Sequence, residues 1–449
     1  MYKKSLIAVS KVGQNKGAPR IWFESNRLKS LGFDPSARIN LSSIPNGIRL
    51  TATDRGERKV SSKRGVPVID LNSFKALSPF KFGEDVKVTS SRGVIEIVPS
   101  LRTFHIREAN AAKSVFRVLE LFAGGGTFHD ALKGLDQYKV VGALEMEARY
   151  LNVYDMKADE VPVLLQGDIR DFEPEDFPKS DIIVAGLPCT DHSLAGRTKK
   201  KLSVPENGAV GNLYVDVLPV VRRQRPLGVV IENVPSYLTS EAGINLVRVL
   251  RQWGYSVTSQ VIDPTDWGEI TSRKRCVIVA TLRGEFRVKQ PNIQKAYVLN
   301  DFLDPEDPIQ DAIDAERDAH SVRYLAERSK KMAEQGNGWR HTIFPRNYSG
   351  KVPTVTKGYY KRQPQSWMIS TPGLGAGARM LRKEEIARIH GHSFPDDIST
   401  TLSTELSGQG VMSRVFSSIF ADLSDFLNDR YAWHEPPLHL DNEQQLELF

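Results

Sequence analysis

The sequence predicts an α/β protein in which a doubly wound, mostly parallel sheet follows a mainly-β N-terminal domain. From Val115 onwards, short apolar runs alternate with glycine turns and helical patterns, and these runs have the length of buried parallel strands. Residues 1–113 instead show short strands separated by turns. At 449 residues, the chain is long enough for two or three domains.

Composition excludes several classes of protein. The sequence has no run of 18 apolar residues, and its N-terminal LIAVS segment is too short for a signal-peptide core, so we expect a cytoplasmic protein. Its two cysteines, Cys189 and Cys276, cannot build a disulfide framework or a zinc site. Residues 1–113 carry 21 Lys and Arg against 9 Asp and Glu. This bias suggests a polyanionic partner, although a solvated charged face is its commoner cause.

Residues 1–113 contain a weak internal repeat with an offset of 47 residues. The repeated apolar pairs are Phe33 and Phe80, Ile39 and Val86, Leu41 and Val88, Ile48 and Ile95, and Leu50 and Ile97. Two copies of a small β-unit, with Gly47 and Gly93 in turns, explain the pattern. The link over 55–64 is a flexible loop or a phosphate-contacting loop. The region resembles swapped-hairpin DNA-binding domains of the AbrB type. The basic residues of the link are Arg55, Arg58, Lys59, Lys63 and Arg64.

Three successive predicted strands end on residues that suit a nucleotide-like ligand. The strand over 116–121 leads into three glycines, 124–126, where the backbone can approach a ligand closely. The next strand ends at Glu145, where doubly wound folds present an acid to ribose hydroxyls. A third ends at Asp168 and Ile169. These three strand ends suit adenosine better than a pyrophosphate, because no cationic residues that could bind phosphates accompany them. Tight packing would also explain the glycines.

The fourth predicted strand ends at a cysteine. The apolar run 182–185 is followed by Gly186, and Cys189 lies where the chain breaks into a loop. Active sites of open α/β sheets collect at the carboxyl ends of strands, so this thiol is suited to chemistry. Taken alone, a small buried cysteine would be the commoner explanation. The basic loop that follows, 194–201, suits either a polyanionic substrate or solvent.

Two further predicted strands carry an acid and a pair of arginines. The fifth, LGVVIENV, ends on Glu232 and Asn233, and desolvation there should raise the pKa of the carboxyl group, as a proton donor to a ring nitrogen requires. The sixth, TSRKRCVIVAT, has Arg273 and Arg275 at alternating positions, which places both guanidinium groups on one side. Cys276 is expected in the core.

In this order, the segments resemble the cytosine carbon-5 DNA methyltransferases. ELFAGGG is similar to that family's cofactor turn, GLPCTDHSLAG to its nucleophile loop, ENV to its proton-relay strand and SRKR to its paired-arginine strand. RMLRKEEIARIHGHSFPD resembles the helix that closes its recognition domain, and ELSGQGVMSRV resembles the segment that returns to the cofactor. The resemblance covers about Phe116 to Leu427. The sequence departs from the usual residues of that family at Glu120, Thr127, Thr271 and Gln409, and at what resembles an insertion of His392 and Ser393.

The resemblance implies a Rossmann-like methyltransferase core with a small target-recognition domain. The expected parts are a basic, possibly duplicated DNA-binding domain (1–113), a catalytic and cofactor-binding core (114–284), a target-recognition region (285–378), a return segment that completes the core (379–428) and a flexible tail (429–449).

It also implies transfer of a methyl group from S-adenosyl-L-methionine to carbon 5 of cytosine in duplex DNA, with the target base flipped out of the helix. Carbon 5 is a weak nucleophile, so the Cys189 thiolate would first add to carbon 6, while Glu232 protonates ring nitrogen 3. Arg275 would contact the carbonyl at carbon 2, and Arg273 and Ser193 would hold phosphates. The implied catalytic set is Cys189, Glu232, Arg273, Arg275, Asn233 and Ser193.

The same resemblance assigns the cofactor contacts. Phe122 would lie against the adenine, the glycine turn beside the methionine part, Glu145 on the ribose, and Asp168 with Ile169 at the adenine edge. The implied set is Phe122, Ala123, Gly124, Gly125, Gly126, Glu145, Met146, Asp168, Ile169, Pro188 and Gln409. No metal site is expected.

Between Ala280 and Arg379, the sequence predicts a helix over 321–335 and an aromatic, basic segment. That segment suits either stacking and phosphate contact or a plain surface hairpin. Its residues are Tyr359, Tyr360, Lys361, Arg362 and Trp367.

The chain ends in QLELF, which resembles the sliding-clamp-binding motif of bacterial replication and repair proteins. The alternative is a tail that folds onto its own domain. The resemblance to the DNA methyltransferases implies a bacterial restriction-modification context, with a plasmid or phage origin as an option. Rival functions are methylation of RNA cytosine and a catalytically silent DNA-binding regulator. The motif consists of Gln445, Leu446, Leu448 and Phe449 around an acidic residue.

Overall fold

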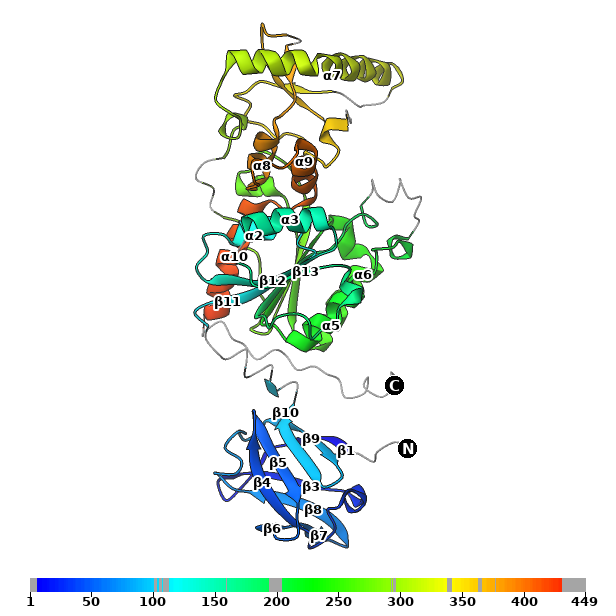
Figure 1. The fold of residues 1–449 in the computed structure, drawn as a ribbon, viewed down its shortest axis with the longest axis vertical. Coiled ribbons are helices and arrows are strands. Elements are labelled where there is room, and N and C mark those ends of the chain that lie inside the picture. The colour runs from blue at the N-terminus through cyan, green and yellow to red at the C-terminus, as the bar shows by residue number, and fades with distance from the viewer. Residues whose placement is uncertain are drawn as a thin grey trace. The chain divides into compact units, whose positions relative to one another are not determined.

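The computed structural model describes residues 6–100, 103–104, 107, 113–158, 160–193, 204–291, 293, 296–336, 341–361, 366–375 and 377–429. The chain forms two compact units, Met1–Ala111 (unit 1) and Ala112–Phe449 (unit 2) (Figure 1). The basic loop at 194–201, Arg362 and the QLELF motif lie outside the described residues. Among the helices that are described, none has the length and apolar character needed to cross a membrane.

Unit 1 consists of two antiparallel sheets around one hydrophobic core. Their strand orders are β1-β9-β10-β5-β4-β6 and β2-β3-β8-β7. Inward-facing residues alternate with outward-facing ones along β9 and β10, as in strands with one buried face. The strands are β1 (Leu6–Lys11), β2 (Gly13–Asn15), β3 (Ala18–Glu24), β4 (Arg38–Ile44), β5 (Gly47–Ala52), β6 (Arg58–Lys59), β7 (Ser61–Lys63), β8 (Val66–Asn72), β9 (Asp85–Ser91) and β10 (Val94–Pro99), with a 3-10 helix η1 (Asn26–Leu31) before β4.

The strands of unit 1 repeat with the offset of the sequence repeat. A shift of 47 residues carries β4 onto β9 and β5 onto β10, residue for residue. Of the ten apolar residues of the repeat, nine are buried, and Leu41 is half-buried against the same core. The repeated pattern therefore describes the core-facing side of two equivalent hairpins.

Unit 2 is built on a seven-stranded sheet with the order β13-β12-β11-β14-β15-β17-β16. The five strands from β13 to β15 are parallel, and β17 runs antiparallel to both β15 and β16. The strands are β11 (Phe116–Leu121), β12 (Tyr138–Glu145), β13 (Leu164–Gln166), β14 (Ile182–Gly186), β15 (Gly228–Asn233), β16 (Ser256–Ile262) and β17 (Arg275–Thr281).

The strand predicted as the sixth of the large sheet, TSRKRCVIVAT, is the seventh in chain order in the structure, β17. The extra strand, β16, is not predicted from the sequence because this edge strand mixes exposed residues with buried ones and lacks an apolar run. With β16 inserted, β17 returns antiparallel, so that Val277 pairs with Glu232 at the carboxyl end of β15. The first residue of β17 is therefore brought close to that same end.

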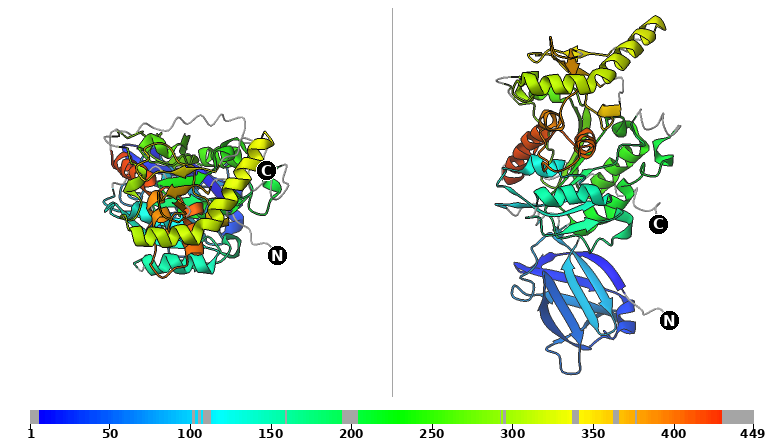
Figure 2. Two further views of the ribbon diagram at one scale, coloured as in Figure 1. Left: turned by 90° about the horizontal axis from the view of Figure 1, so that it is seen from above. Right: turned by 45° about the horizontal axis from the view of Figure 1, so that its top comes forward.

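Helices cover both faces of the large sheet, as a doubly wound fold requires. In Figures 1 and 2, α10 (Ser413–Asn428) lies on one face with α2 (Thr127–Leu132), whereas α5 (Tyr214–Gln224) and α6 (Glu241–Gln252) lie on the other. The buried residues of α10 recur at helical spacing, and the Phe416 and Phe420 rings contact Phe128 of α2 edge-on, with centroids 5.1 and 6.2 Å away. The C-terminal part of the chain thus completes the core beside the glycine turn.

The recognition region has a small core of its own. Its core is formed by α7 (Pro308–Glu334), by a sheet of β18 (Ile343–Phe344), β19 (Met368–Ser370) and β20 (Ala378–Arg379), and by α8 (Lys383–His390) of the return segment. The next helix of the return segment is α9 (Thr400–Gln409). Tyr359 and Trp367 are each 1% exposed within this core. The Tyr359 hydroxyl donates to the Trp367 carbonyl oxygen at 2.7 Å. Both rings are buried, so neither stacking on DNA nor a plain surface hairpin describes them.

Glu120 in β11 is fully buried, and its carboxylate oxygens accept no hydrogen bond within the described residues. His129 Nδ1 lies 4.0 Å from Oε1, and burial lowers the pKa of this histidine. Burial raises the pKa of Glu120 to about 8, although Tyr154 and Lys157 favour the charged form. The folded protein therefore keeps a proton that the unfolded chain loses near pH 4.5.

We expect Glu120→Gln to keep the fold and to remove a pH dependence of stability. The pKa of Glu120 is higher in the folded protein than in the unfolded chain, so its contribution to the free energy of unfolding is fully present below the unfolded pKa. This contribution is lost as pH rises toward about 8, at up to about 1.4 kcal/mol per pH unit. Denaturant titrations between about pH 5 and 8 should give a flatter free energy of unfolding for Glu120→Gln. The exposed Glu173→Gln is the control and should keep the wild-type slope. Equal slopes in all three proteins would contradict a protonated Glu120.

Candidate active site

A cavity of about 230 Å³ opens at the carboxyl ends of β11, β14 and β15 in unit 2. Residues expected from the sequence to bind cofactor and those expected to act on substrate line this one cavity. They are Phe122, Ala123, Gly124, Gly125, Glu145, Pro188, Cys189, Glu232, Arg275 and Gln409.

The turn after β11 orients the Glu145 carboxylate. Phe122 and Gly124 both have a φ of 57°, which bends the chain sharply at the end of the strand. The Gly124 amide donates to Glu145 Oε2 and the Glu147 amide donates to Oε1, each at 2.8 Å. Burial raises the pKa of Glu145, and these backbone donors partly oppose that rise. The result is an acid held in one orientation at the cavity wall.

Gly125 lets the return segment approach the turn. A Cβ atom at this position would lie 2.7 Å from Leu406 Cδ1 of α9. Two further residues of this wall, Tyr150 and Gln409, are joined by a hydrogen bond of 2.9 Å from Gln409 Nε2 to the tyrosine hydroxyl. The sequence analysis missed Tyr150, whose only sequence signal is its position in the helix directly after Glu145.

Cys189 lies in the loop that follows β14, after Leu187 and Pro188, and backbone and side-chain amide hydrogen bonds hold this loop in place. The amides of His192 and Ser193 donate to the Cys189 carbonyl oxygen at 3.1 and 2.8 Å. Asn233, which is fully buried, donates through Nδ2 to the Leu187 carbonyl oxygen at 3.4 Å. Asn233 and Ser193 therefore support the loop and do not line the cavity.

Glu232 and Arg275 form an ion pair at the cavity, with Nε and Oε1 2.8 Å apart. Burial raises the pKa of Glu232, and Arg275 and Arg273 partly offset this effect. Burial also raises the pKa of the Cys189 thiol, Glu232 raises it further, and the two arginines act in the opposite direction. The Cys189 thiol and the Glu232 carboxyl group thus lie in the field of the same two arginines. A negative charge on either group disfavours ionisation of the other.

Arg273 differs from its expected role. β17 begins at Arg275, so the two arginines do not alternate along one strand. Arg273 is 2% exposed, and its Nη2 donates to the carbonyl oxygens of Gly408 and Gly410 at 3.0 and 2.8 Å. Because it is buried and bound to backbone, Arg273 joins the return segment to the catalytic sheet and is not available to a phosphate.

Four expected cofactor residues do not line the cavity. Gly126 lies beneath the turn, where a Cβ would approach Lys157 Cε to 2.8 Å, and Met146 is 57% exposed. Ile169 is buried. Asp168 caps the 3-10 helix Ile169–Asp171 and forms an ion pair of 2.5 Å with Arg170.

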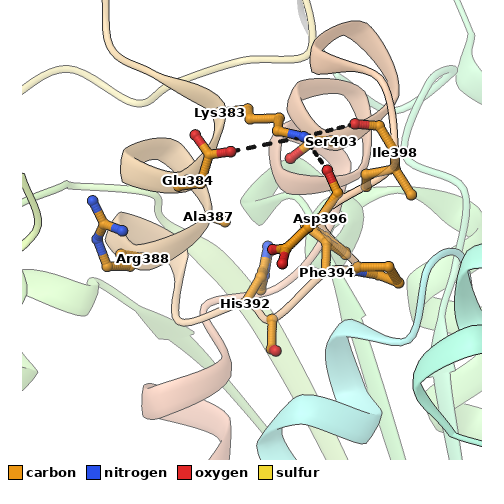
Figure 3. A pocket seen from close by; sticks show the side chains of 11 residues that line it. Lys383, Glu384, Ala387, Arg388, His392, Phe394, Asp396, Ile398 and Ser403 are labelled. Carbon is orange, nitrogen blue, oxygen red and sulfur yellow. Dashed lines mark hydrogen bonds and ion pairs between the residues drawn. The ribbon is translucent and has the colours of Figure 1, made fainter. Parts of the chain in front are cut away.

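A second cavity, of about 180 Å³, lies between α8 and α9 (Figure 3). Lys383 Nζ crosses it and donates to the carbonyl oxygens of Asp396 and Ile398 at 2.7 and 2.9 Å. His392 lines the same space. These contacts brace the connection into α9, which carries Gln409 to the first cavity.

Comparison with known proteins identifies the class of enzyme. The profile of the C-5 cytosine-specific DNA methylase family matches residues 116–424. The chain is 25% identical over 327 residues to the Type II methyltransferase M.HhaI of Haemophilus parahaemolyticus, which covers 70% of this chain and 95% of that protein. It is 27% identical over 298 residues to the Type II methyltransferase M.NlaX of Neisseria lactamica, which covers 64% of this chain and 88% of that protein.

A solved structure, that of the S. pombe Dnmt2 methyltransferase, shares the fold with a TM-score of 0.55 and 19% identity, over 70% of this chain and 99% of that one. The family match spans the sheet, the cavity and the return segment, and it begins after unit 1. The chain therefore belongs to the C-5 cytosine-specific DNA methylase family and is a DNA cytosine-5 methyltransferase.

Proposed function

We propose that this enzyme transfers a methyl group from S-adenosyl-L-methionine to carbon 5 of a flipped cytosine in duplex DNA, through an adduct between Cys189 and carbon 6. The observation that carries the proposal is that Cys189, Glu232 and Arg275 line the same cavity as the glycine turn. S-adenosyl-L-methionine, when bound, supplies an electrophilic methyl group on a sulfonium.

The residues of the turn fit this cofactor. Glu145 presents a carboxylate whose orientation is fixed by two amides, which suits the hydroxyl groups of a ribose. Gly124 carries no Cβ, and no described atom lies within 4 Å of the place where one would be, so an adenosine can lie close to the backbone there. Phe122 and Pro188 supply apolar surface for the adenine ring.

Cys189 begins the reaction on the base. The thiol first loses its proton to solvent, and the sulfur of the thiolate adds to carbon 6. The ring electrons shift toward nitrogen 3, and Glu232 delivers a proton there. Burial raises the pKa of Glu232, which favours uptake of the proton that it delivers, while Arg275 fixes the carboxyl group and reaches the carbonyl at carbon 2. Once carbon 5 carries the methyl group, it loses its proton to solvent and the bond between carbon 6 and the sulfur breaks. Nitrogen 3 returns its proton to Glu232, and the aromatic ring is restored.

A base in a stacked duplex cannot enter a cavity of about 230 Å³. The target cytosine must therefore rotate out of the helix, at a cost of a few kcal/mol for unstacking and unpairing. Duplex DNA is the favoured substrate because the matched relatives are Type II methyltransferases of the DNA methylase family, and we infer a restriction-modification context on the same ground.

Cys189→Ser should lower methyl transfer by more than about 1,000-fold, because a serine hydroxyl is a far weaker nucleophile than a thiolate. The matched control is Cys276→Ser, since Cys276 is buried, and its Sγ donates to the Val234 carbonyl oxygen at 3.2 Å. The control should keep most of the activity. The measurement is transfer of labelled methyl groups to duplex DNA, with tRNA in parallel. Normal transfer by Cys189→Ser would refute the adduct, and transfer to tRNA alone would refute the DNA substrate.

Glu232→Gln should lower kcat by about 100- to 10,000-fold, because glutamine keeps the shape of the side chain and cannot deliver the proton. It should also shift ionisation of Cys189 to lower pH, since the negative charge of Glu232 raises the pKa of that thiol. The rate of alkylation of Cys189, followed against pH in a Cys276→Ser background, measures this shift separately from activity. An unchanged alkylation profile would mean that the two groups are not coupled.

We also infer that the C-terminal motif of Gln445, Leu446, Leu448 and Phe449 binds a bacterial sliding clamp through apolar anchors in a preformed groove. Leu448→Ala with Phe449→Ala should weaken binding of the full chain to the clamp by at least about 10-fold, as expected for the loss of two anchors. Asn442→Ala, just upstream, is the control and should bind as the wild type does. Undetectable binding by the wild-type chain would end this proposal.

A further inference from the structure

Residues 6–100 fold as two interlocked copies of one β-unit, β1 to β5 and β6 to β10 (Figure 1). The first strand of each copy pairs with the hairpin of the other, because β1 pairs with β9 and β6 pairs with β4. At the centre β5 pairs with β10, where Arg49 faces Glu96, 47 residues later, in an ion pair of 2.6 Å. Unit 1 is thus a single-chain counterpart of a twofold dimer.

The two copies carry equivalent basic turns. The β2–β3 hairpin closes through Lys16 and Gly17, and the β7–β8 hairpin closes through Arg64 and Gly65. Lys16 and Arg64 have φ values of 50° and 52°, and the glycines that follow have 82° and 79°. These are the angles of two-residue type I′ hairpin turns. We call Lys16–Gly17 and Arg64–Gly65 the basic turns.

A cation is an unfavourable choice at the first position of such a turn. The left-handed conformation costs a residue other than glycine roughly 1–2 kcal/mol, and asparagine or aspartate tolerates it best. Both copies nevertheless have a long cationic side chain there. Both side chains are exposed, and within the described part of the chain neither forms an ion pair. Lys63, the neighbour of Arg64, is by contrast engaged, 5.1 Å from the centre of the Trp22 ring.

The geometry of the four-stranded sheet sets the spacing of the basic turns. Because β3 and β8 are antiparallel neighbours, the turns that precede them lie at opposite ends of the sheet. The path between the turns runs along β3 from Ala18 to Glu24, crosses to its partner Val68 on β8, and continues to Val66. At the rise per residue of a β-strand, this path gives a separation of roughly 30 Å between the turns. One turn of B-DNA is about 34 Å long. The long side chains of the basic turns can span the small difference between this length and the separation of the turns.

We propose that unit 1 binds duplex DNA through the two basic turns, with Lys16 and Arg64 on backbone phosphates about one helical turn apart on one face of the duplex. The charge of the unit supports this partner, since residues 1–111 carry 20 Lys and Arg against 9 Asp and Glu. Contacts of this kind are independent of base sequence, so the unit adds affinity for DNA around the site that unit 2 modifies.

The test replaces both cations by asparagine, Lys16→Asn with Arg64→Asn. This double variant creates two Asn-Gly turns, the preferred sequence for type I′ geometry, so its thermal unfolding midpoint should equal or exceed that of the wild type. The full chain is measured on a duplex with long flanks. We expect the slope of log affinity against log salt to fall in magnitude by about 1.8, because two phosphate contacts are lost. Hydroxyl-radical protection of two flanking backbone positions about one helical turn apart should disappear.

The control removes two other exposed cations of unit 1, Lys29→Ala with Lys75→Ala, and should keep the salt slope and the flanking protection. Methyl transfer to a short duplex without flanks should be the same in all three proteins, which separates this proposal from the assignment of the catalytic residues. Retention of the protection in the asparagine variant, equal losses in the control, or equal competition by double-stranded RNA would each overturn the proposal.

Discussion

The active site depends on the ion pair between Glu232 and Arg275, which exists because one strand runs against its neighbours. A carboxylate at the end of a buried parallel strand would be costly to ionise without a partner. The antiparallel direction of β17 brings its first residue to the carboxyl end of β15, so that Arg275 lies beside Glu232. The parallel neighbour β14 brings Cys189 to the same edge. Strand direction thus determines which charges meet.

The cavity is closed by parts of the chain that are far apart in sequence. Arg273, near the start of β17, binds the carbonyl oxygens of Gly408 and Gly410, while Gly125 leaves room for Leu406. Gln409 then reaches the wall that contains Tyr150. The recognition region is inserted between these partners, so both of its ends are attached to the catalytic sheet.

Much of the site was predictable because glycine turns and polar residues at the ends of apolar runs mark a cavity-forming edge. Cys189, Glu232 and Glu145 were found in this way. Burial of Arg273 was not predictable, because a basic residue beside a reactive strand has the same local pattern whether it binds phosphate or backbone. Trp367 and Tyr359 show the same ambiguity, since aromatic and basic residues interleave on binding surfaces and around small cores alike. The edge strand β16 was missed because its pattern is partly polar.

Fusion of two equivalent halves into one chain frees unit 1 from the symmetry that a homodimer must obey. Identical subunits present identical surfaces, and so they match targets with dyad symmetry. Here the halves have diverged, because 55–64 carries five basic residues, whereas the equivalent stretch 7–16 carries only Lys11 and Lys16. In the proposed complex with duplex DNA, this asymmetry lets unit 1 favour one orientation along the duplex, whereas a dimer of identical subunits binds equally well in both orientations.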